Sequence, residues 1–242
     1  IDGFRFDLVG LIDTVTINKI IEEVHKTHPN VIFYGEGWTM STQVTKQGYT
    51  MTTQANSAHT PEFSFFSDTI RDALKGSVFN NSETGYISGA AGKETTLEYC
   101  FLGLAPVWCN TPSQCVNYVS CHDNYTLWDK LTYSCPDASE EKKLAMNRLA
   151  ASIVFTAQGI PFFLQGEEFA RTKPIEGSDE VAENSFNLPL YTNSLKYGRM
   201  SEYAELMEFY KGLIVFRKEH KGLRLATAEE VANQIQFLED TP

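Results

Sequence analysis

The pattern of apolar and polar residues along the chain predicts strands that alternate with helices. At residues 3–9, apolar side chains alternate with Gly, Arg and Asp, which predicts a strand with one apolar face. Residues 14–28 then place Val and Ile at helical spacing, with Asp13 or Thr14 as the cap. A short apolar run at residues 31–34 predicts a second, buried strand. This order, with brief connections, is typical of a parallel sheet.

The same alternation continues along the chain. We predict further strands at residues 62–67, 116–120 and 160–164, and helices at residues 69–74, 94–102, 126–131, 140–157 and 202–217. Polar stretches at residues 38–60, 79–93 and 166–199 are predicted loops, long enough to shape a cleft. The prediction is an α/β fold with five strands in this chain.

The length of 242 residues suits one (β/α)8 barrel, which takes roughly 250 residues. Such a barrel needs eight strands, however, and the first predicted strand already begins at the first residues of the chain. We therefore expect the chain to be an excerpt, with the N-terminal half of the barrel supplied by the parent chain.

Three carboxylates stand where predicted strands end. Asp7, Glu36 and Asp123 each follow an apolar, β-branched or aromatic run. Acids at the carboxyl ends of parallel strands can converge on one pocket. Cleavage of a glycosidic bond needs one carboxylate as nucleophile and one carboxylic acid as proton donor. The pattern therefore indicates sugar chemistry.

Each of these residues also has a plainer interpretation. Arg5 beside Asp7 would keep a nucleophile ionised, or it forms an ordinary ion pair at a strand end. Glu36 between two glycines is either an acid over a cleft or a turn residue exposed to water. Asp123 is either a ligand for sugar hydroxyls or a helix N-cap. Trp38 is either a stacking platform for a sugar or a core anchor.

Composition and charge narrow the function. A hydrophobic content of 42% permits a large core, and 12% aromatic residues suit a carbohydrate cleft as well as packing. The net charge of −11 argues against binding nucleic acid, because the phosphate backbone would be repelled. The longest apolar run, at residues 149–155, is too short to span a bilayer. A neutral polymer is the better substrate.

Cysteines and histidines show no ligand spacing. The five cysteines form no Cys-x-x-Cys pair, so we expect free buried thiols, with one Cys109–Cys115 bridge left open. Free thiols favour a reducing or anaerobic setting, but the sequence leaves localisation open between secretion and cytoplasm. We expect neither a metal site nor a cofactor. The histidines taken to be structural or surface residues are His25, His28, His59 and His220.

Three ordered segments resemble a known family. They are GFRFD at residues 3–7, YGEGW at residues 34–38 and VSCHDN at residues 119–124. Together they resemble signature segments of the α-amylase superfamily, glycoside hydrolase family 13. The flanking residues 122–131, 158–161 and 166–171 resemble those of type I pullulanases. The resemblance extends over nearly the whole chain.

The resemblance implies a (β/α)8 TIM barrel of which this chain holds strands four to eight. The partial catalytic barrel would span residues 1–222. Residues 223–242 would then be the truncated start of a C-terminal β-sandwich domain.

The resemblance also implies a role for each residue of the site. Asp7 would be the nucleophile, Glu36 the general acid/base and Asp123 the stabiliser of the transition state. The implied substrate-binding residues are Arg5 and His122 at the cleavage subsite and Trp38 beneath a glucose on the leaving side.

The implied reaction is hydrolysis of α-1,6 linkages in pullulan, amylopectin or limit dextrins, with retention of configuration. The alternatives are an isoamylase-like glycogen debranching enzyme, an amylopullulanase and a glycan-binding fragment without activity. One departure from the family pattern affects substrate contacts. Where related chains carry Asn-Ser-Tyr-x-Ser-Pro-Asp, residues 184–190 end in Leu190, so an expected carboxylate contact is replaced.

Overall fold

The computed structural model describes residues 1–40, 47–105, 108–109 and 111–238. Its centre is a curled sheet of five parallel strands, and each strand pairs with its neighbours in chain order. The strands are β1 (Gly3–Phe6), β2 (Ile32–Gly35), β3 (Phe63–Phe66), β4 (Cys115–Asn117) and β5 (Ile160–Pro161). All five lie within the predicted segments or extend one residue beyond them. The predicted partial (β/α) barrel is confirmed as a half-barrel.

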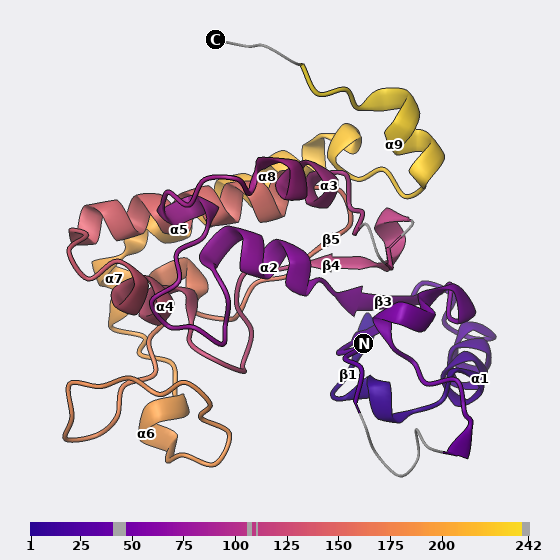
Figure 1. The fold of residues 1–242 in the computed structure, drawn as a ribbon, viewed down its shortest axis with the longest axis horizontal. Coiled ribbons are helices and arrows are strands. Elements are labelled where there is room, and N and C mark those ends of the chain that lie inside the picture. The colour runs from indigo at the N-terminus through magenta and orange to yellow at the C-terminus, as the bar shows by residue number, and fades with distance from the viewer. Residues whose placement is uncertain (41–46, 106–107, 110, 239–242) are drawn as a thin grey trace.

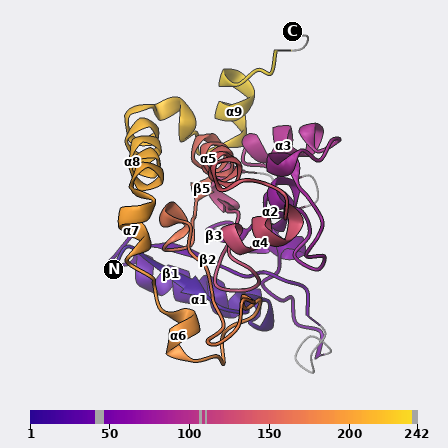
Figure 2. The same cartoon turned by 90° about the vertical axis from the view of Figure 1, so that its left-hand side faces the viewer.

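Helices connect the strands and cover the outside of the curl (Figures 1 and 2). The helices are α1 (Thr14–His25), α2 (Asp68–Lys75), α3 (Glu94–Phe101), α4 (Leu127–Ser134), α5 (Glu140–Thr156), α6 (Leu190–Asn193), α7 (Arg199–Glu202), α8 (Ala204–Glu219) and α9 (Ala228–Gln234). As predicted, α1 has Asp13 as its N-cap, which accepts from the Thr16 amide at 2.9 Å. The predicted helix at 202–217 is divided between α7 and α8, because Tyr203 leaves the helical backbone conformation.

The two faces of the sheet have different neighbours. Phe33 and Phe63 point outward into a core that includes the apolar side of α1. Arg5, Tyr34 and Phe66 point inward, where the Tyr34 and Phe66 rings lie 5.7 Å apart and the Arg5 guanidinium lies 5.8 Å from the Phe66 ring. The alternation read from residues 3–9 is therefore the alternation of the two faces. Arg5, the only charged residue in the five described strands, lies on the inner face.

In the outer layer, α5 and α8 pack against each other. Figures 1 and 2 show α5 and α8 side by side at one end of the molecule, while α1 lies at the other. Phe155 of α5 and Tyr210 of α8 pack edge to face, with ring centroids 5.9 Å apart. The five cysteines are unbridged, including Cys109 and Cys115. Within the described ranges, no helix combines the length and apolar character required to span a membrane.

The C-terminal segment does not show the expected β-domain. Residues 223–238 contain α9 and no strand, and the Phe237 ring packs against Phe101 of α3 at a centroid distance of 6.3 Å. Residues 239–242 lie outside the described residues, as do residues 41–46 of the predicted loop at 38–60. The β-sandwich domain after residue 222 remains a prediction.

Candidate active site

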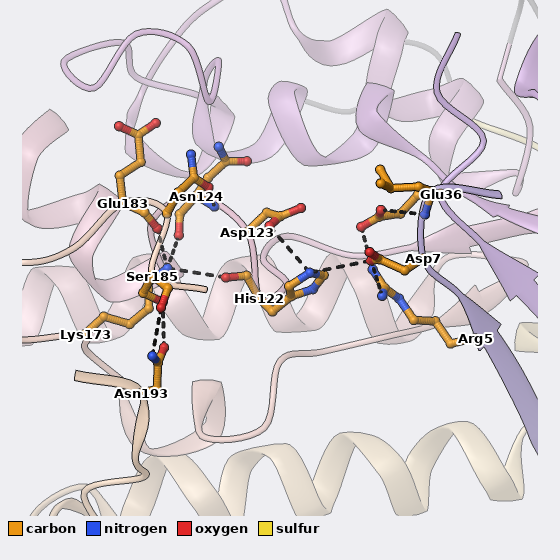
Figure 3. A network of polar contacts seen from close by, with 12 residues as sticks. Arg5, Asp7, Glu36, His122, Asp123, Asn124, Lys173, Glu183, Ser185 and Asn193 are labelled. Carbon is orange, nitrogen blue, oxygen red and sulfur yellow. Dashed lines mark hydrogen bonds and ion pairs between the residues drawn. The ribbon is translucent and has the colours of Figure 1, made fainter. Parts of the chain in front are cut away.

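The carboxyl ends of three strands bring the predicted residues together (Figure 3). Asp7 follows β1 and Glu36 follows β2, and their strands are held in register by the pairing of Phe6 with Gly35. His122 and Asp123 arrive from the segment after β4. One carboxylate oxygen of Asp7, one of Glu36 and a ring nitrogen of His122 all lie within 4.8 Å of one another.

Arg5 bridges the first two carboxylates. Its Nη1 atom donates to Asp7 Oδ1 at 2.6 Å, and its Nη2 atom donates to Glu36 Oε1 at 2.5 Å. The planar guanidinium therefore fixes the separation of the two acids as well as their orientation. The predicted ion pair between Arg5 and Asp7 is present, and Arg5 extends it to Glu36.

The two acids lie in different surroundings. The Asp7 side chain is 58% exposed, whereas the Glu36 side chain is 4% exposed. Burial raises the pKa of Glu36, against the opposing effects of Arg5 and of the Leu8 amide, which donates to Glu36 Oε2 at 3.3 Å. The charges of Asp7 and Asp123 raise the Glu36 pKa further, but less than burial does. The interpretation of Glu36 as a turn residue exposed to water is therefore wrong.

Two glycines allow Glu36 to lie at this depth. A Cβ on Gly35 would meet the Phe6 carbonyl oxygen at 2.3 Å, and one on Gly37 would meet the Phe65 ring at 2.3 Å. Both glycines therefore serve the close approach of β2 to its neighbours. A side chain at either position would push the Glu36 backbone out of the site.

Asp123 is not a helix cap. Thr126 is the N-cap of α4 and accepts from the Asp129 amide at 3.1 Å, so that interpretation of Asp123 is wrong. The Asp123 carboxylate lies instead 3.4 Å from His122 Nε2, and the same nitrogen lies 3.8 Å from Asp7 Oδ1. His122 therefore lies between Asp123 and Asp7, and Asp7 is in turn bound by Arg5.

A hollow of about 260 Å³ opens beside these residues, and Glu36 and Asp123 are on its wall. Trp38 and Phe79 add aromatic surface to the lining. The Trp38 ring lies 5.9 Å from the Arg71 guanidinium, and it also packs against the inner core. The interpretation of Trp38 as a core anchor is supported by this packing. Its role as a stacking platform for a sugar stays a prediction, with the residue on the wall of the hollow.

In the described part of the chain, one group of side chains could hold a metal ion. It consists of Asp7, Glu36 and His122. The Arg5 guanidinium already lies between the two carboxylates at hydrogen-bonding distance. A second cation in that space would be repelled. The arrangement is better suited to proton transfer and nucleophilic attack than to metal binding.

Comparisons with known proteins find relatives of the whole chain, although no protein-family model matches it. The chain is 34% identical over 244 residues to the pullulanase of Bacillus subtilis (strain 168), covering 98% of this chain and 33% of that protein. A crystal structure of the Paenibacillus barengoltzii pullulanase in complex with maltohexaose and alpha-cyclodextrin matches with a TM-score of 0.91 and 40% identity. That match covers 100% of this chain and 37% of the other.

The pullulanase of Anoxybacillus sp. LM18-11, complexed with maltotetraose, matches with a TM-score of 0.91 and 37% identity, covering 100% of this chain and 34% of the other. The chain is homologous to the pullulanases. This confirms the resemblance to pullulanases indicated by the sequence. The chain spans about a third of the length of the pullulanases that it matches.

Three residues beside the candidate site, Leu8, Asn124 and Asn184, were not predicted from the sequence. The Leu8 amide reaches Glu36 because Leu8 adopts a left-handed backbone with φ of 48°. Asn124 is also left-handed, with φ of 57°, and its amide donates to Asn184 Oδ1 at 3.0 Å. Leu8 gives no sequence signal for this conformation, whereas Asn124 gives a weak one, because Asn adopts positive φ more often than other residues with a side chain. The neighbouring Asn184 belongs to the segment in which Leu190, 81% exposed, departs from the family pattern.

Proposed function

We propose that this chain carries the catalytic centre of a retaining glycoside hydrolase that cleaves α-1,6 linkages in branched α-glucans. The observation that carries the proposal is the pair formed by Asp7 and Glu36. Their nearest carboxylate oxygens lie within 4.8 Å, close to the roughly 5 Å typical of retaining enzymes, whereas inverting enzymes need more room for a water.

The different surroundings of the two acids suit two different roles. Glu36, buried and with a raised pKa, protonates the glycosidic oxygen as the bond to the leaving sugar breaks. Asp7, paired with Arg5, attacks the anomeric carbon and forms a covalent glycosyl-enzyme. Glu36 then removes a proton from water, which attacks the same carbon and releases Asp7.

The surrounding residues bind the sugar. Asp123 and His122 lie where they can hydrogen-bond the hydroxyls of the ring being cleaved, and these bonds strengthen as the ring flattens. Trp38, on the wall of the hollow beside Glu36, offers an aromatic face to a glucose on the leaving side. Arg5 keeps both carboxylates in place throughout the reaction.

The substrate class rests on the relatives together with the charge of the chain. The matched proteins are named pullulanases, and two of their structures hold maltooligosaccharides. The net charge of −11 is compatible with a neutral glucan. We further propose that additional strands complete the barrel in the parent chain, since the sheet is a five-stranded half-barrel and the relatives are about three times as long. The catalytic part would then end near residue 222.

The test is product analysis on pullulan with the intact wild-type parent protein and its variants Asp7→Asn and Glu36→Gln, because the isolated half-barrel can be inactive by itself. The proposal predicts that the wild type releases maltotriose and that both variants lose nearly all activity. Panose or isopanose as the main product would indicate α-1,4 cleavage instead. Glucan binding without hydrolysis by the wild type would favour the glycan-binding alternative.

A further inference from the structure

The segment that carries Asp123 is held by a buried lysine from a different part of the chain. Lys173 is 2% exposed, and its Nζ donates to the backbone carbonyl of His122 at 3.4 Å and to that of Asn124. These two carbonyls are on either side of Asp123. The same ammonium also donates to the carbonyl of Glu183. Figure 3 shows Lys173 at the centre of these contacts.

The backbone of Lys173 is itself anchored to the helix that follows the site. Its amide donates to Asp129 Oδ2 at 2.9 Å, and Thr172 donates to Asp129 Oδ1 at 2.5 Å. Asp129 is 2% exposed and lies in the first turn of α4. The lysine is therefore a fixed point, and the three carbonyls are arranged around it.

The segment held by this lysine turns sharply at Asn124. Asn124 has φ of 57°, a left-handed conformation that Asn adopts more readily than other residues with a side chain. Both ends of its peptide group are used, since the amide donates to Asn184 and the carbonyl accepts from Lys173. Burial lowers the pKa of Lys173 to about 8, so the ammonium is mostly protonated at pH 7 and offers three donors.

We propose that Lys173 is a positioning residue that holds the Asp123 carboxylate in the site by binding the carbonyls before and after it. The proposal rests on the proposed role of Asp123 in the reaction. Lys173 itself does not touch the reacting atoms. Its loss leaves three partly buried carbonyls without this donor and releases the left-handed turn. Asp123 then shifts in the site, and a misplacement of about 1 Å is enough to slow the reaction strongly.

The main test compares Lys173→Met with a matched control, Arg217→Met. Arg217 is also a buried cation, and it donates to the carbonyls of Phe155, Ala157 and Gly159. Those carbonyls precede β5, at the opposite end of the sheet from the site. Both variants lose a buried cation that binds three carbonyls, but only Lys173→Met releases the Asp123 segment.

We expect Lys173→Met to lower kcat on pullulan by about 10- to 100-fold, with KM changed by less than about 3-fold. Arg217→Met should lower the melting temperature yet leave kcat within about 2-fold of wild type. Lys173→Arg, which keeps the charge and the donors, should recover part of kcat. Equal kcat losses in Lys173→Met and Arg217→Met would overturn the proposal. If Lys173→Met does not fold, Lys173→Gln replaces it in the same comparison.

A second measurement does not depend on catalysis. Amide hydrogen exchange at Asn124 should become at least about 10-fold faster in Lys173→Met than in Arg217→Met, because the turn is released. If the wild type does not hydrolyse pullulan, the proposed function fails while this measurement still decides the role of Lys173. Unchanged exchange at residues 122–124 would contradict the positioning role.

Discussion

Two regions of the site are positioned by different means. Asp7 and Glu36 stand at the ends of paired strands, where the register of β1 and β2 and the Arg5 bridge set their separation. Asp123 stands in an irregular segment beyond β4, held by Lys173 and by Asn184 through Asn124. The first region depends on regular backbone pairing. The second depends on individual side chains from a distant loop.

The largest expected effect on kcat comes from replacing the proton donor of the first region. Glu36→Gln removes the proton donor and keeps the shape, so kcat on pullulan should fall by about 10²- to 10⁴-fold. The alkaline limb of the pH–kcat profile should disappear in the same variant, because the wild-type limb reports loss of the proton from Glu36. Steady-state kinetics across pH measure both changes, and a retained alkaline limb in Glu36→Gln would assign it to another group.

A smaller effect is expected from a steric clash between the two strands of the first region. Gly35→Ala places a Cβ 2.3 Å from the Phe6 carbonyl oxygen, so it should destabilise the protein by about 1–3 kcal/mol and lower kcat as well. Gly212→Ala in α8 is the control, because its Cβ would meet nothing within 4 Å and the change favours the helix. Chemical denaturation measures both, and equal stabilities would show that the close approach of β1 and β2 is unimportant.

The stability of the protein should depend on pH through Glu167, which lies close to the second region. Glu167 accepts from Ser120 Oγ at 2.5 Å, and burial raises its pKa to about 7 from 4.5. The folded state binds the Glu167 proton more tightly than the unfolded state does, so protonation of Glu167 stabilises the fold. This contribution to the unfolding free energy is fully present below pH 4.5 and is lost as pH rises through 7. The difference in unfolding free energy between pH 5 and pH 8 should therefore shrink in Glu167→Gln, on the order of 1–3 kcal/mol. The same pH dependence in both proteins would contradict this assignment.

The smallest expected effect comes from Asn184→Ala, which tests whether Asn184 and Lys173 hold the same turn of the second region. Asn184→Ala removes the acceptor for the Asn124 amide, which should cost about 1 kcal/mol and lower kcat by about 5-fold. Double-mutant kinetics with Lys173→Met should then show losses that do not add, because both changes release the same turn. Strictly additive losses would mean that Asn184 and Lys173 act on separate elements.

The same division explains what the sequence could predict. The strand positions, the two faces of β1 and the placement of Asp7 and Glu36 follow from alternation and from the carboxyl-end rule for parallel strands. The depth of Glu36 did not follow, since the close approach of Gly35 and Gly37 depends on Phe6 and Phe65 in neighbouring strands. Local pattern carries no information about those contacts.

The second region was less predictable for a related reason. A helix cap was one of two local interpretations of Asp123, yet Thr126 is the cap. The contact of Lys173 with His122 spans 51 residues, and its contact with Asn124 spans 49. The family motif placed Asp123 in the site, whereas the residues that hold it there could be found only from the folded chain.

The central claim is that Asp7 and Glu36 act as nucleophile and acid/base in a retaining reaction. The most direct test is proton NMR of pullulan hydrolysis, recorded before the newly formed reducing ends mutarotate. The account predicts that the α-anomer of the new reducing end appears first. Initial appearance of the β-anomer would show inversion and contradict the roles assigned to the two carboxylates.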